Sequence, residues 1–135
     1  MNIEVTSLVI AAMRRAAAQA HPEEACGILL GKDKGEGACI TALLPAPNVH
    51  SNPKTHFEID PQTLVDAHRA AREGGPLVLG YFHSHPIGEA HPSATDEEMA
   101  AGDGAIWAIA GSGEIRFWSS NPKGFEPLSP SITAR

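Results

Sequence analysis

Sixteen residues, YFHSHPIGEAHPSATD from Tyr81 to Asp96, hold three of the chain's seven histidines, together with two serines and an aspartate. The preceding run, 76–82, is apolar at nearly every position, which is typical of a central strand covered on both faces. Because residues i and i+2 of a strand face the same side, His83 and His85 are predicted to point into one site at the strand's end. Asp96, at the start of the next predicted helix, can supply a third ligand. Such a set leaves one position of a tetrahedral zinc open for water, as in a catalytic site.

Each part of this pattern also has a purely structural interpretation. A lone histidine on an apolar strand is usually a packed or surface residue, and Ser-x-x-Asp is commonly only a helix cap. For His83 and His85 alone, both interpretations stay open. His91 is interpreted as a loop residue, because a fourth protein ligand would close the metal site.

The complete constellation is more specific than its parts. HSHP at 83–86, followed by Ser93 and Asp96, closely resembles the signature of the JAMM (MPN+) metalloproteases. The family's remaining element is a glutamate before a small apolar strand. The segment HPEEACGILLG at 21–31 looks like that element, with Glu24 in the family's position and Glu23 beside it. The resemblance extends from this segment to the last predicted hairpin, and every motif position is filled.

The resemblance implies a fold, a cofactor and a role for each motif residue. The fold is α/β, a single JAMM/MPN (cytidine-deaminase-like) domain with a mixed β-sheet flanked by helices. One Zn²⁺ per chain is bound by His83, His85 and Asp96, and zinc brings the pKa of its water to roughly 7. Glu24 takes a proton from this water and returns it to the leaving amine. Ser93 donates a hydrogen bond to the oxyanion, and it can cap a helix at the same time.

The family also implies a partner. Its members cleave after the C-terminal glycines of ubiquitin or related proteins, so the expected substrate is a ubiquitin-like or sulfur-carrier protein that ends in Gly-Gly. Glycines let a substrate backbone approach a metal closely, and an extended tail can add to the rim of a sheet. The alternative is a non-catalytic module that binds ubiquitin-like proteins and contains a structural zinc. The sequence makes no prediction of the oligomeric state.

Other chemistries fit less well. The combination of H-x-E with a downstream P-C-x-x-C that marks zinc nucleobase deaminases is missing, and so is the H-E-x-x-H helix of common metalloproteases. Cys26 is a conceivable nucleophile, but a position inside an apolar strand would bury its thiol and raise the thiol pKa. We interpret Cys26 as a packing residue.

The predicted elements alternate between helices and strands, which favours an α/β or α+β sheet. Helices are predicted over 7–20, capped by Thr6 or Ser7, over 61–72, capped by Asp60, and over 97–101, after the capping arrangement at 93–96. Strands are predicted over 25–31, 38–44, 56–59, 76–82, 105–110 and 114–118.

Composition limits the remaining possibilities. A length of 135 residues with 42% hydrophobic and 19% charged residues suits one globular domain, predicted over 1–120, with an extended or mobile tail over 121–135. The net charge of −6 and ten scattered Lys and Arg argue against binding to nucleic acid. The apolar run at 8–13 is too short for a membrane span or a signal peptide, and two cysteines without CxxC spacing indicate a reducing cytoplasm.

Overall fold

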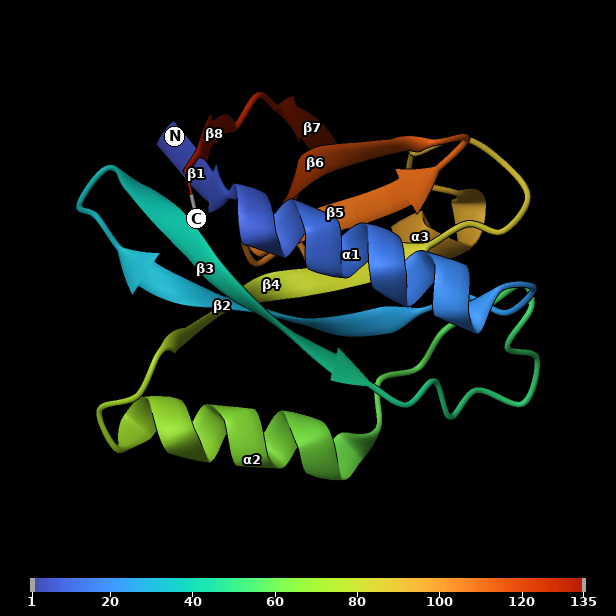
Figure 1. Ribbon diagram of the computed structural model, residues 1–135, viewed down its shortest axis with the longest axis horizontal. Helices are drawn as coiled ribbons and strands as arrows, with labels where there is room; N and C mark the ends of the chain where they lie inside the picture. Colours follow the sequence, from blue (N-terminus) through green and yellow to red (C-terminus); the bar gives the residue numbers. More distant parts are fainter. Residues whose placement is uncertain (1, 135) are drawn as a thin grey trace.

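The structure is a computed structural model that describes residues 2–134. Three helices and eight strands follow one another along the chain (Figure 1). In chain order they are β1 (Asn2–Thr6), α1 (Ser7–Ala20), β2 (Cys26–Asp33), β3 (Gly37–Ala46), α2 (Pro61–Arg72), β4 (Leu77–Ser84), α3 (Ala94–Met99), β5 (Ile106–Gly111), β6 (Glu114–Asn121), β7 (Gly124–Leu128) and β8 (Ser131–Thr133).

All eight strands belong to one mixed sheet in the order β7-β6-β5-β4-β2-β3-β1-β8. The central strand β4 runs antiparallel to β2 and parallel to β5. Edge strands of a flat eight-stranded sheet would lie about 34 Å apart, given a spacing of about 4.8 Å between neighbours. Only residues 129 and 130 link β7 to β8, and this link reaches about 11 Å at most. The sheet is therefore strongly curled, and its two edge strands lie near each other (Figure 1).

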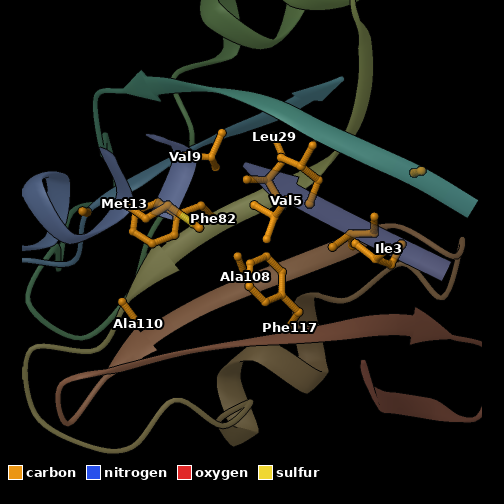
Figure 2. Close-up of a cluster of buried hydrophobic side chains, with 13 residues drawn as sticks. Ile3, Val5, Val9, Met13, Leu29, Phe82, Ala108, Ala110 and Phe117 are labelled. Atoms are coloured by element: carbon orange, nitrogen blue, oxygen red, sulfur yellow. The ribbon is translucent and has the colours of Figure 1, made fainter. Parts of the chain in front are cut away.

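Two apolar clusters pack on opposite faces of the sheet. One cluster joins α1 to the sheet through Val9 and Met13, and Figure 2 shows Phe82 among its side chains. The other cluster joins α2 to the sheet through Ala67 and includes Trp107. Because side chains alternate along a strand, a residue next to Phe82 must point to the second cluster's face. The face of the sheet that carries α2 is therefore the one to which His83 points.

Most of the predicted elements are confirmed. Helices α1 and α2 have the expected bounds, and their N-caps are Thr6 and Asp60. The short helix α3 begins three residues earlier than predicted, because Ser93 is its N-cap. The α/β fold with a mixed sheet and flanking helices is also confirmed. Among the described residues, no helix is both long enough and apolar enough to cross a membrane.

Three parts of the sheet differ from the sequence prediction. Strand β1 was not predicted; it has five residues, of which only Ile3 and Val5 are buried. The predicted strand over 56–59 is wrong: this segment makes a single bridge, between Asn48 and Ile59, because side-chain hydrogen bonds replace a ladder there. Residues 121–134, the described part of the segment expected to be an extended or mobile tail, include β7 and β8, and the pairing of these two strands into the sheet was not predicted.

Candidate metal site and its surroundings

His83 and His85 lie at the carboxyl end of the central strand, as predicted. His83 is the seventh residue of β4 and is completely buried. His85 follows the last residue of β4, and its backbone N–H donates to the Ala110 carbonyl at 2.7 Å. Strands β2 and β5 hold β4 on both sides, so the backbone that carries both imidazoles is rigidly supported.

Asp96 reaches the same point from the first turn of α3. The helix begins with a capping box in which Ser93 Oγ accepts from the Asp96 N–H at 3.0 Å, and Asp96 Oδ2 accepts from the Ser93 N–H at 2.9 Å. This reciprocal pair fixes the direction of the carboxylate. Asp96 is 3% exposed, so its charge is well removed from solvent.

Three ligand atoms converge in a nearly equilateral triangle. His83 Nε2, His85 Nε2 and Asp96 Oδ2 lie 3.1 Å from one another. Ligands of a tetrahedral metal with bonds of about 2.05 Å are separated by about 3.3 Å, so the triangle has the size that a metal ion requires. Among the described residues, this is the one group of three that could hold a metal ion.

The hydrogen bonds around the triangle favour metal binding. His85 Nδ1 donates to the Glu89 carbonyl at 2.8 Å, so Nε2 is the ring nitrogen that faces the site. Burial alone would lower the pKa of His85, but its hydrogen bonds to Asp96 and Glu89 raise it, so this ring releases a proton when a metal binds. Burial lowers the pKa of His83 and so favours the neutral ring, which is the metal-binding form. Burial alone would raise the pKa of Asp96, but hydrogen bonds from His83 and His85 hold it well below its usual range. A charged carboxylate and two neutral imidazoles are a common ligand set for a divalent metal.

Glu24 lies beside the triangle, two residues before β2. Its backbone N–H donates to the Pro53 carbonyl at 2.7 Å. The residue is 7% exposed, and its carboxyl group makes no hydrogen bond within residues 2–134. Burial raises the pKa of Glu24 to about 7, while His85 lowers it and Asp96 raises it, so the carboxyl lies within electrostatic range of the triangle. A carboxyl with a pKa near neutrality can both accept and release a proton.

The other candidates have clear places in the structure. Ser93 is half-buried and uses Oγ as an acceptor in the cap, so its hydroxyl proton is free for a further acceptor. His91 lies outside the triangle and packs against Trp118. Cys26 is buried, and burial raises its thiol pKa to about 12, as expected for a packing residue.

Sequence reasoning missed the residues that surround His83. The Phe57 ring stacks on the His83 imidazole with centroids 4.3 Å apart, and the Trp107 ring meets it edge-on at 5.7 Å. Phe57 lies in a segment that had been assigned to a strand, so its contact with a residue 26 positions away had no local signal. Asn48, in the loop between β3 and α2, was also missed, although an asparagine in a long loop is a signal for side-chain hydrogen bonds to backbone.

Two curated relatives share the sequence over most of the chain. A desampylase from Haloferax volcanii is 35% identical over 101 residues, covering 75% of this chain and 71% of the relative. A CysO-cysteine peptidase from Mycobacterium bovis is 29% identical over 101 residues, covering 75% of this chain and 67% of the relative.

Solved structures share the fold over nearly the whole chain. A protein from Desulfitobacterium hafniense matches with a TM-score of 0.87 at 28% identity, covering 98% of this chain and 94% of its own. A JAB1/MPN domain protein from Archaeoglobus fulgidus matches with a TM-score of 0.64 at 17% identity, covering 98% and 97% of the two chains. This second match shows the JAB1/MPN fold. Residues 6–121 match the family described as prokaryotic homologs of the JAB domain, which agrees with the motif, the triangle of ligands and the fold. The chain therefore belongs to this family.

Proposed function

We propose that this chain is a JAMM-type zinc metallopeptidase that hydrolyses the amide bond after the C-terminal Gly-Gly of a ubiquitin-like or sulfur-carrier protein. The observation that carries the proposal is the triangle of His83, His85 and Asp96 with a buried carboxyl, Glu24, beside it. The names of the relatives support the substrate class, since one is a desampylase and another a CysO-cysteine peptidase.

His83, His85 and Asp96 would hold one zinc ion per chain. When bound, zinc acts as a Lewis acid and lowers the pKa of water from 15.7 to roughly 7. Two imidazoles and one carboxylate, with no fourth protein ligand within residues 2–134, suit a catalytic rather than a structural zinc. Asp96 contributes its negative charge, and the capping box keeps the carboxylate oxygen directed at the ligand triangle.

Glu24 moves the proton. Its carboxylate accepts a proton from the attacking water, and the resulting carboxylic acid protonates the departing amine nitrogen. A pKa of about 7 permits both steps at neutral pH, because neither protonation state is strongly favoured. Ser93 donates its free hydroxyl hydrogen to the oxygen that becomes negative as the carbonyl carbon is attacked.

Under this proposal the protein works in the cytoplasm. Cys26 and Cys39 are both free and buried, so the fold contains no disulfide among the described residues and is compatible with a reducing compartment.

The proposal is tested with a β-grasp carrier protein joined through its C-terminal Gly-Gly to the side chain of a lysine. Protein loaded with zinc is expected to release the intact carrier. A chelator should abolish the release, and one equivalent of zinc should restore it. Binding of the conjugate without cleavage, whether or not zinc is present, would contradict the proposal and favour a binding module with a structural zinc.

A further inference from the structure

The loop between β3 and α2, residues 47–60, is organised by the side chain of one residue, Asn48. The hydrogen bonds of this amide are as follows: Nδ2 donates to the carbonyl oxygens of Glu24 (3.0 Å), His56 (3.0 Å) and Pro53 (3.4 Å), and Oδ1 accepts from the N–H groups of His50 (3.1 Å) and Glu58 (3.0 Å). A primary amide has two donor hydrogens and two acceptor lone pairs, so Asn48 uses its full hydrogen-bonding capacity. The β3–α2 loop is thus held as one unit by this amide together with two backbone hydrogen bonds, Val49 N–H to the Glu58 carbonyl at 2.9 Å and Asp60 N–H to the Pro47 carbonyl at 3.1 Å.

One end of this unit is attached to Glu24. The Glu24 carbonyl accepts from Asn48, and the Glu24 N–H donates to Pro53. Ala25, the next residue, is held by Ser84, whose N–H donates to the Ala25 carbonyl at 3.1 Å and whose Oγ accepts from the Ala25 N–H at 2.8 Å, and the ladder between β2 and β4 begins at Cys26. Since the Glu24 carboxyl makes no hydrogen bond within residues 2–134, the position of this carboxyl depends on its backbone, which the loop holds at Glu24 and Ser84 holds at Ala25.

The other end of the unit is attached to a metal ligand. Phe57 stacks on His83 with an angle of 16° between the rings, and Trp107 stands against the same imidazole at 89°. A metal-ligating histidine usually donates its second N–H to a carboxylate, carbonyl or water, which fixes the ring orientation. In this chain His83 Nδ1 is buried without a hydrogen-bond partner among the described residues. Ring packing against Phe57 and Trp107 takes the place of that hydrogen bond.

We propose that Asn48 and Phe57 are positioning residues, through which the β3–α2 loop sets both the proton carrier Glu24 and the metal ligand His83. The inference rests on the proposed function for the roles of Glu24 and His83. The side chains of the loop take no part in the chemical reaction; they position the two residues that do. Asn48 holds the base in place, and Phe57 holds the ligand ring in place.

The Asn48 half is tested with Asn48→Asp. This change keeps the acceptors for His50 and Glu58, removes the donors to Glu24 and His56, and sets a negative charge against carbonyl oxygens. We expect zinc content and KM to stay the same, kcat to fall by about 10²-fold, as for a base displaced by about 1 Å, and the Glu24 amide hydrogen to exchange faster.

The matched control is Asn52→Asp, the same chemical change on an exposed side chain of the same loop that makes no hydrogen bond. It should leave kcat and the exchange of the Glu24 amide unchanged. Should Asn48→Asp fail to fold, Asn48→Ala removes the same bonds without adding charge. Wild-type exchange at the Glu24 amide in the folded Asn48 variant would overturn this half of the inference.

The Phe57 half is tested with Phe57→Leu, which keeps an apolar side chain but removes the ring. We expect zinc affinity, measured by competition with a chromogenic chelator, to fall by about 10-fold or more, as when the outer support of a ligand is lost. Phe125→Leu is the matched control, because Phe125 packs edge-on against Trp107 at 5.0 Å without stacking on His83. The control should retain wild-type zinc affinity, and equal affinity in both variants would overturn the role of Phe57.

Neither zinc affinity nor amide exchange requires a substrate. If wild-type protein cleaves no Gly-Gly conjugate, the proposed function fails, while these two measurements still decide the inference. If wild-type protein is active and both variants match it in affinity and exchange, only the inference fails.

Discussion

Cys26 and His83 are paired across the antiparallel ladder of β2 and β4. The same register, continued two residues beyond the first pair, sets Glu24 opposite His85. A slip of one residue would turn every side chain of β2 to the other face of the sheet, so burial of both faces specifies this register strongly. The strand pair therefore carries a proposed metal ligand, His83, on β4, and the segment leading into β2 brings the proposed base, Glu24, to the same place.

Glu24→Gln is expected to retain zinc and to lower kcat by roughly 10²- to 10⁴-fold, the usual contribution of a general acid/base. The glutamine amide matches the shape of the carboxyl but cannot take up a proton. Zinc content by metal analysis and turnover of a Gly-Gly conjugate are measured on the same preparation. Glu23→Gln is the control, since Glu23 is exposed. Wild-type turnover in Glu24→Gln would remove Glu24 from the mechanism.

His83→Ala and Asp96→Ala are each expected to abolish zinc binding while the fold largely survives. Each change removes one corner of the triangle whose sides are 3.1 Å, and two remaining protein ligands hold zinc weakly. Wild-type protein should contain about one zinc per chain by metal analysis, and circular dichroism checks the fold. His91→Ala, which changes a histidine outside the triangle, should keep its zinc. Full occupancy in both ligand variants would show that the metal binds elsewhere.

Ser93→Ala separates two roles of one hydroxyl. Loss of an oxyanion donor should lower kcat on the order of 10²-fold with little change in KM, because the donor acts mainly in the transition state. Loss of the cap alone would cost about 1 kcal/mol of stability and leave kcat unchanged. Thr6→Ala is the comparison, since Thr6 caps α1 through a 3.3 Å bond and lies outside the ligand triangle. A loss of stability without a loss of kcat at Ser93 would favour the cap-only role.

The Cys26 thiol should resist alkylation in the folded protein. Burial raises its pKa to about 12, so at pH 8 only about 10⁻⁴ of the thiol is thiolate, the reactive form. The reactive fraction should rise with pH, by about tenfold per unit, as long as the chain stays folded. Site-resolved mass spectrometry after treatment with iodoacetamide measures the modification, with urea-unfolded protein as the positive control. Rapid labelling of Cys26 at pH 8 would mean that the thiol is accessible and acidic.

The sequence was sufficient to predict the positions of residues whose chemical type coincides with a secondary-structure pattern. His83 and His85 at the end of an apolar run, and Ser93 three residues before Asp96, are local patterns whose geometry follows from strand alternation and helix capping. The parts that it missed depend on contacts between distant segments. Phe57 reaches His83 through a loop held by side-chain hydrogen bonds, which leave no periodic signal.

The ends of the sheet were missed for a related reason. Strand β1 is short and half-exposed, and β8 is three residues long, so neither has enough apolar residues to stand out. Strand β1 forms because it pairs with the edge of β3, and β8 forms because it pairs with the free edge of β1. Pairing partners are a property of the curled sheet, and a local reading of the tail contains no information about that curl.

The last prediction concerns the substrate. The carrier fold and its Gly-Gly end should matter more than the group that leaves, because glycines let an extended tail approach the ligand triangle without side-chain clashes. The test offers three substrates at equal concentration: a β-grasp carrier adduct ending in Gly-Gly, the same adduct with Ala-Ala, and an unstructured Gly-Gly peptide. We expect kcat/KM to fall for the second substrate because the two methyl groups exclude the tail, and for the third because the folded carrier no longer contributes binding.

Changing the leaving group from a peptide extension to a single amino acid or a lysine side chain should have a smaller effect on kcat/KM than either of these changes. Equal cleavage of all three substrates would defeat the hypothesis and identify a general peptidase.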